Sequence, residues 1–220
     1  MKSVLITGGN KGIGFETARQ LLKKGYYIFL GSRNLENGVK AVDKLKAEGL
    51  KNVELIQIDV NSSESIEAAR KIIAENQNKL DILINNAAIN GGHPQNSLDT
   101  GVNTFKDVFE TNFFGVVRVT QSFMSLLRNA EEPRIVNVST SLASLTLHKD
   151  TAWDFYDVKV PAYESSKAAL NMYTINLAYE MKNTPLRVNA VDPGWTDTDF
   201  TDNQGTGSVE LAATRIIKYA

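Results

Sequence analysis

The 220-residue sequence predicts an α/β protein of one domain, built on a doubly wound parallel sheet. Three observations support this prediction. Short apolar runs rich in β-branched residues alternate with helical patterns several turns long, a glycine-rich turn connects the first run to the first helical pattern, and no linker or low-complexity tract interrupts the alternation. Because parallel strands require long crossover connections, such a chain covers both faces of its sheet with helices.

The apolar runs predict the strands in chain order. They are Val4–Thr7, Tyr27–Gly31, Val53–Asp59, Ile82–Asn85, Ile135–Ser139 and Val188–Val191. Right-handed crossovers between them give the doubly wound order, in which ligands bind along the carboxyl ends of the strands. Two long stretches lack a regular pattern, and loops of this length often carry function. The second of them, Leu142–Pro161, contains Trp153, Phe155 and Tyr156, which could either cap a substrate pocket or pack an extra helix against the body.

The glycine turn Gly8–Gly14 follows the first strand directly and opens a helical pattern over Phe15–Lys24. Glycines in this position permit a tight turn and a close backbone approach, so a pyrophosphate can bind the free N–H groups at the positive end of the helix. The spacing of Gly8, Gly12 and Gly14 differs from the common G-x-G-x-x-G pattern. The strand before the turn and the helix after it still favour a dinucleotide site over a plain structural turn.

Composition narrows the possible functions. With 42% hydrophobic residues the chain can build one sizeable core, and its net charge of −1 and pI near 6.2 provide no basic surface for nucleic acid. No apolar run is long enough to cross a membrane, and no signal-peptide pattern precedes the first strand, which favours a cytoplasmic protein. The chain has no cysteine, and His93 and His148 lack partners at ligand spacing, so we expect no thiolate chemistry and no metal site.

Tyr163 and Lys167 lie four residues apart in a stretch of helical composition, so one turn of helix places a phenol beside an ammonium group. A phenol with the ordinary pKa of about 10 is a poor acid–base catalyst at neutral pH. A nearby cation favours the phenolate and lowers this pKa. The pair therefore predicts proton transfer by a tyrosine, although taken alone it could be an ordinary surface pair.

Six motifs in the chain follow the order found in the short-chain dehydrogenase/reductase family, which the sequence resembles over almost its whole length. They are Thr7–Gly14, Asn85–Ala88, Thr111–Asn112, Ser139–Ser141, Tyr163 with Lys167, and Pro193–Gly194. The resemblance implies a Rossmann-type fold. The first and last motifs and the Thr111–Gly115 run look most like the carbonyl reductase branch, whose members reduce ketones and aldehydes with NADPH.

The same resemblance implies a role for each catalytic residue. Tyr163 would protonate the substrate oxygen, Lys167 would lower its pKa and hold the nicotinamide ribose, and Asn112 would anchor a water that connects Lys167 to solvent. A hydroxyl after the fifth strand would orient the substrate oxygen. Thr140 aligns best with the serine of the family, followed by Ser139, although threonine restricts the direction of its oxygen more than serine does.

The second strand ends in Gly31-Ser32-Arg33 and has no carboxylate for a ribose 2′-hydroxyl. Arg33 and Lys11 place two cations where a 2′-phosphate would lie, which favours NADPH over NADH unless both are ordinary surface charges. The resemblance also assigns Asp59 to the adenine. Together, the residues expected to bind the cofactor are Gly8, Asn10, Lys11, Gly12, Ile13, Gly14, Arg33, Asp59, Val60, Asn86, Ala87, Ala88, Tyr163, Lys167, Pro193, Gly194, Trp195, Thr196 and Thr198. Ala88 stands where the family usually has glycine.

The leading prediction is thus NADPH-dependent reduction of a small carbonyl substrate to an alcohol. Alternatives are an alcohol dehydrogenase that acts mainly in the oxidative direction, a dinucleotide-sensing protein without turnover, and an epimerase or dehydratase, which the lack of a second substrate domain disfavours. Both a monomer and a homo-oligomer remain open. After the sixth strand the family adds a helix and a seventh strand, and because this sequence ends at Ala220 within that helix, we expect the seventh strand to be missing.

Overall fold

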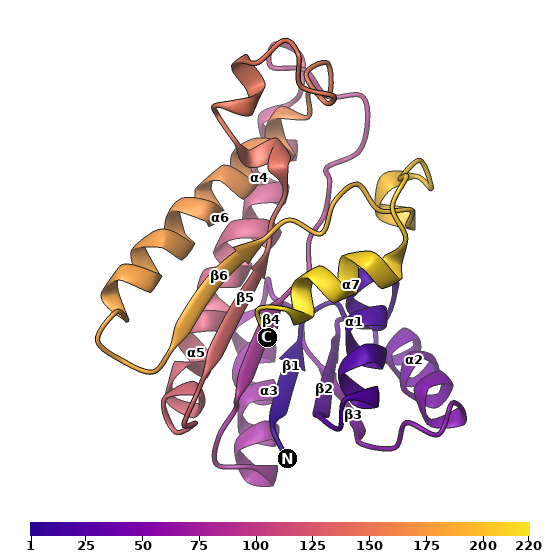
Figure 1. Cartoon of the computed structure of the whole chain (residues 1–220), viewed down its shortest axis with the longest axis vertical. Coiled ribbons are helices and arrows are strands. Elements are labelled where there is room, and N and C mark those ends of the chain that lie inside the picture. The colour runs from indigo at the N-terminus through magenta and orange to yellow at the C-terminus, as the bar shows by residue number, and fades with distance from the viewer.

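The computed structural model describes all residues from Met1 to Ala220 and contains one six-stranded sheet (Figure 1). All of its strands are parallel, in the order β3-β2-β1-β4-β5-β6. The strands are β1 (Ser3–Ile6), β2 (Tyr27–Ser32), β3 (Val53–Gln57), β4 (Ile82–Asn85), β5 (Arg134–Val138) and β6 (Arg187–Val191). The doubly wound order is therefore confirmed, with the change of direction between β1 and β4.

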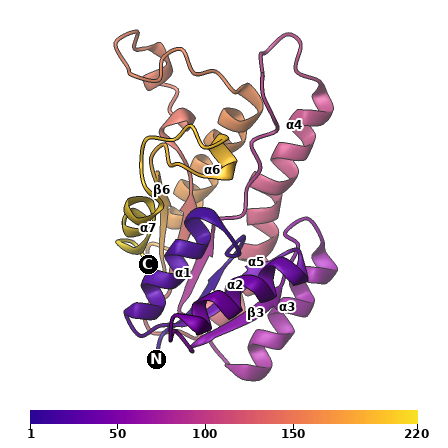
Figure 2. The same cartoon turned by 90° about the vertical axis from the view of Figure 1, so that its right-hand side faces the viewer.

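Helices cover both faces of the sheet (Figure 2). They are α1 (Gly12–Lys23), α2 (Leu35–Ala47), α3 (Ser63–Asn76), α4 (Val102–Phe109), α5 (Gly115–Arg128), α6 (Pro161–Glu180) and α7 (Val209–Ile217). The first, second and seventh helices share one core cluster with the sheet, and the third, fifth and sixth share the other. None of these helices is long and apolar enough to span a membrane.

The alternation of side chains along the central strand explains the two clusters. In β1, Val4 and Ile6 belong to the core on the α1 side, whereas Leu5 belongs to the core on the α5 side. All three are fully buried, as expected for a strand in the middle of a parallel sheet. Burial on both faces accounts for the unbroken apolar runs in the sequence.

The predicted third strand was two residues too long. It ends at Gln57, because the Asp59 N–H donates to Ser65 Oγ over 2.9 Å and the Asp59 carboxylate accepts from the Asn61 N–H over 3.0 Å. These local hydrogen bonds compete with strand pairing and turn the chain into α3. As a result, Asp59 lies in the loop at the carboxyl end of the sheet.

A short π-helix, η1 (Glu110–Phe114), joins α4 to α5 and contains Thr111 and Asn112. The extra residue in each hydrogen-bonded turn of a π-helix shifts the side chains that follow, and such segments are frequent at functional sites. Asn112 therefore lies in a helical segment whose geometry differs from that of an α-helix.

The long loops gather at the carboxyl ends of the strands, at the top of Figure 1. The segment after β5 contains two short 3₁₀ helices, η2 (Ser141–Ala143) and η3 (Leu147–Lys149), and the segment after β6 contains a third, η4 (Asp199–Thr201). The last helix, α7, packs against α1. No seventh strand follows β6, so this strand forms the edge of the sheet.

Candidate active site

The glycine turn lies between β1 and α1, and two of its glycines are required by space. Gly8 has a φ of +63°, and a Cβ there would lie 3.0 Å from the Ala87 Cα. A Cβ at Gly14 would lie 2.5 Å from Asn86 Nδ2 and 2.6 Å from the Gly8 carbonyl. The turn is thus pressed against the Asn86–Ala87 segment that follows β4, and a side chain at either glycine would push the two apart.

Asn86 holds the turn in place through its side chain. Its Nδ2 donates to the carbonyls of Thr7 and Gly8, each over 3.0 Å. The Thr7 hydroxyl in turn accepts from the backbone N–H groups of Asn86 at 3.0 Å and Ala87 at 3.1 Å. Asn86 therefore binds the backbone of the turn and fixes the turn against the end of β4. Ala88 follows in the same segment and is partly exposed.

The first turn of α1 suits an anion. In contrast to α2, α3 and α7, whose N-caps are asparagine or serine side chains, α1 begins after Lys11 without a side-chain cap and has no acidic residue in its first turn. The backbone N–H groups of Gly12, Ile13 and Gly14 make no hydrogen bond in the protein. Free donors at the positive end of a helix dipole form a ready site for phosphate, so these residues fit a dinucleotide.

The two cations expected near a 2′-phosphate are in different situations. Arg33 is exposed at the end of β2, and its guanidinium group makes no hydrogen bond or ion pair. The Lys11 ammonium group instead lies 3.0 Å from the Asp199 carboxylate of η4, and both side chains are mostly exposed. The sequence did not predict this ion pair, because its partners are far apart in the chain. Arg33 is therefore the available cation of the two.

The segment after β6 closes the same edge. Thr198 lies against Gly12, with its Cγ2 3.6 Å from the place of a Cβ there. Gly194 has a φ of +85°, and the Arg215 guanidinium group, which donates to the Pro193 carbonyl over 2.8 Å, occupies the space of a side chain at that glycine. The buried Thr196 donates from its hydroxyl to the Gly194 carbonyl over 3.0 Å. Of the expected residues of this segment, Thr198 contacts the glycine turn, whereas Trp195 is half-exposed.

Tyr163 and Lys167 project from the first turns of α6, next to the end of β5. The Lys167 side chain is 2% exposed, and its ammonium group donates to the Val138 carbonyl over 2.7 Å. The same nitrogen lies 5.9 Å from the centre of the Tyr163 ring. The helical spacing therefore brings the two groups together as predicted. The Tyr163 hydroxyl makes no hydrogen bond within the protein.

The predicted direction of the Tyr163 pKa shift is wrong for this structure. Burial raises the pKa of Tyr163 well above its ordinary value of 10.0, and the negative charge of Asp192 raises it further. Burial also lowers the pKa of Lys167 to about 8, from an ordinary value of 10.5. Loss of water around both groups disfavours their charged forms, and this effect outweighs the attraction between an ammonium group and a phenolate.

The three hydroxyls after β5 are in distinct environments. The Ser139 hydroxyl donates a hydrogen bond to Asn171 Oδ1 on α6 over 2.6 Å, so it has no further donor for a substrate. Thr140 accepts from the Leu142 N–H over 3.2 Å as the N-cap of η2, which leaves its own proton free. The Ser141 hydroxyl makes no hydrogen bond. Of the two candidates for orienting a substrate oxygen, Thr140 retains a donor and Ser139 does not.

Asn112 is fully buried, and its side-chain amide donates two hydrogen bonds and accepts one within the protein. Its Oδ1 accepts from the Ile89 N–H over 2.9 Å, and its Nδ2 donates to the Ile89 carbonyl over 2.9 Å and to Ser166 Oγ over 3.1 Å. The residue therefore ties the loop after β4 to α6, three positions beyond Tyr163. The water that the resemblance assigns to Asn112 stays a prediction.

Asp192 is a site residue that the sequence analysis missed. Its carboxylate accepts from the Ser141 N–H over 3.0 Å and from the Gly194 N–H over 2.8 Å, so it connects the loop after β5 to the turn after β6. Its charge also acts on Tyr163, as described above. The signal in the sequence was its place directly before Pro193-Gly194, at the end of the sixth strand, where ligands of this fold bind.

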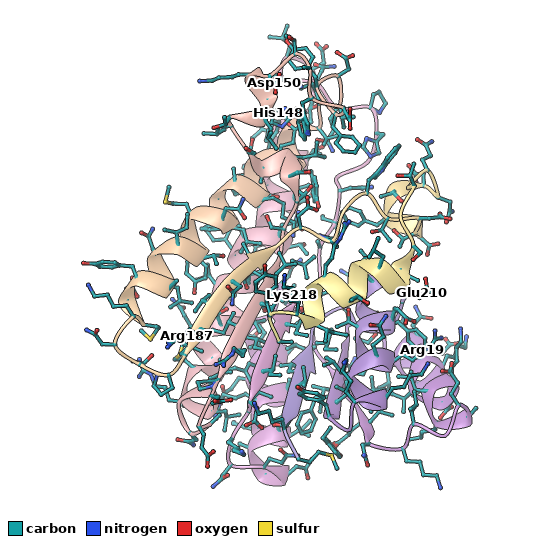
Figure 3. The ribbon with its side chains drawn as sticks, viewed as in Figure 1. Arg19, His148, Asp150, Arg187, Glu210 and Lys218 are labelled. Atoms are coloured by element: carbon teal, nitrogen blue, oxygen red, sulfur yellow. The ribbon has the colours of Figure 1, made fainter.

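Aromatic side chains connect the segment after β5 to the segment after β6. Edge-to-face contacts run from His148 to Trp153 with ring centres 5.3 Å apart, from Trp153 to Phe155 at 5.6 Å, and from Phe155 to Trp195 at 5.9 Å. Phe200 lies 5.5 Å from the Tyr163 ring. Figure 3 shows His148 at the far end of the molecule, beyond the sheet. The insertion was expected either to cap the site or to pack an extra helix against the body. Its helix η3 is only three residues long, and its rings reach Trp195, so the structure favours the cap.

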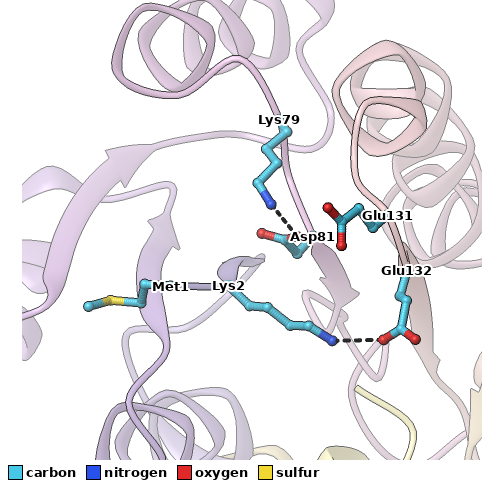
Figure 4. A pocket seen from close by; sticks show the side chains of 6 residues that line it. All are labelled: Met1, Lys2, Lys79, Asp81, Glu131 and Glu132. Carbon is cyan, nitrogen blue, oxygen red and sulfur yellow. Dashed lines mark hydrogen bonds and ion pairs between the residues drawn. The ribbon is translucent and has the colours of Figure 1, made fainter.

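A hollow at the opposite edge of the sheet offers no second site (Figure 4). It is lined by Met1, Lys2, Lys79, Asp81, Glu131 and Glu132. Its charges largely pair among themselves, Lys2 with Glu132 and Lys79 with Asp81, each at 3.1 Å. The hollow lies at the amino ends of β1 and β4, away from the glycine turn.

The turn that suits a pyrophosphate and the tyrosine–lysine pair open onto the same edge of a doubly wound sheet, which places the protein in the class of dinucleotide-dependent oxidoreductases. A family model described as short chain dehydrogenase matches residues 2–208. A Penicillium roqueforti relative, "Short-chain dehydrogenase anuI", is 38% identical over 223 residues, which cover 99% of this chain and 87% of the relative. The chain therefore belongs to the short-chain dehydrogenase/reductase family, whose members bind NAD(P).

Two further comparisons agree with this assignment. The (+)-neomenthol dehydrogenase of Capsicum annuum is 30% identical over 285 residues, covering 98% of this chain and 90% of that protein. The structure of NADPH-bound carbonyl reductase from chicken fatty liver matches with a TM-score of 0.86 and 26% identity, and covers 99% of this chain and 90% of its own. The predicted family and its Rossmann-type fold are thus confirmed.

Proposed function

We propose that the protein reduces ketones or aldehydes to alcohols with NADPH, and that Tyr163 donates the proton. The observation that carries this proposal is the pairing of Tyr163 with the buried Lys167, whose ammonium group is bound to the Val138 carbonyl two residues before Thr140, which has a free hydroxyl donor. A sensing protein without turnover would have no use for this arrangement. The carbonyl reductase that matches in structure binds NADPH, which supports the same choice.

A reduced nicotinamide supplies the hydride when it is bound. The residues of the chain then have three tasks. The first turn of α1 and the exposed Arg33 bind phosphates, Thr140 donates a hydrogen bond to the substrate oxygen, and Tyr163 Oη transfers its proton to the oxygen as negative charge develops on it. Lys167, near the Tyr163 ring, stabilises the phenolate that remains after the transfer.

Burial raises the pKa of Tyr163, which keeps the phenol protonated at neutral pH, the form that donates a proton in reduction. An alcohol dehydrogenase that works mainly by oxidation is the alternative, since the same tyrosine would then act as the base. The partly exposed rings of Phe155 and Phe200 and the exposed Trp195 support an apolar substrate of some size. The name of the Capsicum annuum relative, (+)-neomenthol dehydrogenase, supports the same class of substrate.

Replacing Tyr163 by phenylalanine tests the chemical step. The Tyr163→Phe variant keeps the ring that packs against Phe200 but loses the proton, so we expect kcat to fall by at least about 100-fold while the Kd for NADPH stays within about threefold. The measurement is loss of nicotinamide absorbance with a panel of carbonyl substrates, beside a fluorescence titration with NADPH. Turnover that survives this substitution would remove Tyr163 from the mechanism.

The choice of NADPH is tested at Arg33. The Arg33→Asp variant places a carboxylate where the 2′-phosphate would bind, so we expect its affinity for NADPH to fall by about tenfold or more and its affinity for NADH to be retained. Exchanging another exposed cation of the same protein, in Lys40→Asp, serves as the control for net charge. An unchanged preference between the two nucleotides would show that Arg33 is a surface charge without a role in binding.

A further inference from the structure

Three residues of α6 form a polar seam with β5 and the residue that follows it, and the proposed mechanism uses only Lys167 among them. Lys167, Asn171 and Thr174 are spaced at four and three positions, so they lie on one face of the helix. Lys167 donates to the Val138 carbonyl, Asn171 Oδ1 accepts from the Ser139 hydroxyl over 2.6 Å, and Thr174 Oγ1 accepts from Asn137 Nδ2 over 2.8 Å.

Most of the seam is buried. Asn137, Ser139, Lys167 and Thr174 are all at most 5% exposed, whereas Asn171 is partly exposed and its hydrogen bond to Ser139 is partly buried. It also continues into the sheet, because Asn137 Oδ1 accepts from Asn85 Nδ2 on β4 over 2.8 Å. Buried polar groups that lose their partner are costly, so each of these contacts selects one placement of the helix.

Hydrogen bonds set position more narrowly than apolar contacts do. Apolar packing fills space without a directional preference, whereas a hydrogen bond weakens steeply with distance and angle. The helix that is placed in this way carries Tyr163, and Ser139 and Thr140 directly follow the strand. Any slippage between α6 and β5 would change the distance between the two groups that must meet one substrate oxygen.

We propose that Asn171 is a positioning residue that acts through Ser139, and that their hydrogen bond holds α6 in register with β5 so that Tyr163 faces Thr140. Ser139, expected as the second choice for contacting the substrate, thus orients the helix instead. This inference rests on the proposed function in taking Tyr163 and Thr140 as the reacting pair.

The test compares Ser139→Ala, Asn171→Ala and the double variant. Each removes the same hydrogen bond, so we expect each to lower kcat by about tenfold or more, since small displacements of reacting groups are costly. The kcat of the double variant should fall by about the same factor as that of either single variant, because all three lack the same hydrogen bond. The KM for NADPH should change less than about twofold in all three, since none removes a group of the phosphate site.

Two further variants separate positioning from general damage. Ser139→Thr keeps the hydroxyl donor and should retain most of the kcat that Ser139→Ala loses. Ser165→Ala removes an exposed hydroxyl from the same helix and should match the wild type. Losses of Ser139→Ala and Asn171→Ala that multiply in the double variant would overturn the proposal, as would an Asn171→Ala variant with the kcat of the wild type.

Amide hydrogen exchange provides a measurement that does not need turnover. In both single variants we expect faster exchange in the first half of α6 and at the end of β5, and unchanged exchange in α1 and α2. If the wild-type protein reduces no carbonyl, the proposed function is contradicted. The exchange rates alone would then test whether the Ser139–Asn171 hydrogen bond holds α6 against β5. If amide exchange in α6 stays at the wild-type rate in Asn171→Ala, the claim that this hydrogen bond positions the helix is contradicted.

Discussion

Tyr163 and Lys167 illustrate what a residue pair can and cannot reveal. Their spacing correctly predicted that they would be neighbours, because helical geometry is local. The direction of the Tyr163 pKa shift was wrong, because it depends on how much water the rest of the protein removes and on Asp192, a residue 29 positions further along the sequence. Loss of water around the phenol raises the pKa of Tyr163, so it keeps its proton at neutral pH in this structure.

Burial of Lys167 predicts a pH dependence of stability. Its pKa is about 8 in the folded protein and 10.5 ordinarily, so between these values the unfolded chain holds a proton that the folded chain has released. The free energy of unfolding therefore rises with pH across this window. Relative to Lys167→Met, we expect the wild type to gain on the order of 2 kcal/mol from about pH 8 to about pH 10, since one pKa unit corresponds to about 1.4 kcal/mol.

Urea denaturation at several pH values measures this difference. Lys182→Met, which removes an exposed lysine just beyond the end of α6, is the control for the loss of a positive charge. A difference between wild type and Lys167→Met that stays constant or shrinks with rising pH would show that the ammonium group is not desolvated.

Among the elements, the turn between β1 and α1 depends most on what lies next to it in space. The sequence showed glycines between a strand and a helix, and the structure shows why Gly14 has to be one of them: the Asn86 side chain and the Gly8 carbonyl occupy the space of a Cβ. The π-helix η1 has the same character, because its hydrogen-bonding pattern places Asn112 against both the loop after β4 and α6. Neither packing partner is adjacent in the chain.

The Gly14→Ala substitution tests the close packing of the turn. Its methyl group would force Asn86 away from the carbonyls of Thr7 and Gly8, so we expect a destabilisation of about 1–3 kcal/mol and a loss of NADPH affinity of about tenfold or more. Thermal unfolding and a fluorescence titration measure the two effects. Gly101→Ala is the matched control, because no atom lies within 4 Å of a Cβ there. Equal effects of both substitutions would contradict the assigned packing.

On the scale of the whole molecule, three loops that follow β4, β5 and β6 converge over one edge of the sheet. Asn90 Nδ2, after β4, donates to the Phe200 carbonyl, after β6, over 2.8 Å. The aromatic contacts that end at Trp195 join the loop after β5 to the same segment. The parallel sheet brings these loops together because all of its strands end at the same edge.

The aromatic contact between Phe155 and Trp195 predicts a change in substrate preference. In Phe155→Ala the insertion loses its contact with Trp195, so we expect the KM for apolar ketones with rings to rise by about fivefold, as for the loss of about 1 kcal/mol, with little change for small aldehydes. Tyr156→Ala removes the neighbouring ring, which packs against Lys159 instead of Trp195, and should leave both KM values unchanged. A larger rise in KM for Tyr156→Ala than for Phe155→Ala would contradict a role of the Phe155–Trp195 contact in binding the substrate.

Most of the fold could be predicted from the sequence, because it follows from local patterns. The six strands were located to within two residues, and the error at Asp59 came from side-chain hydrogen bonds that a hydrophobic pattern does not record. The neighbouring positions of Tyr163 and Lys167 were also predicted. The ion pair of Lys11 with Asp199 and the partner of Ser139 on α6 were not, because each joins residues far apart in the chain.

The sequence by itself determined the alternation of strands and helices, the place of the glycine turn and the pairing of Tyr163 with Lys167. These depend on periodicity and on contacts within a single helical turn. Only the tertiary structure decided which hydroxyl after β5 keeps a free proton, where the ammonium group of Lys11 lies, and that the pKa of Tyr163 is raised. Burial and hydrogen bonding between distant segments set these properties, and they arise only when the sheet brings the segments together.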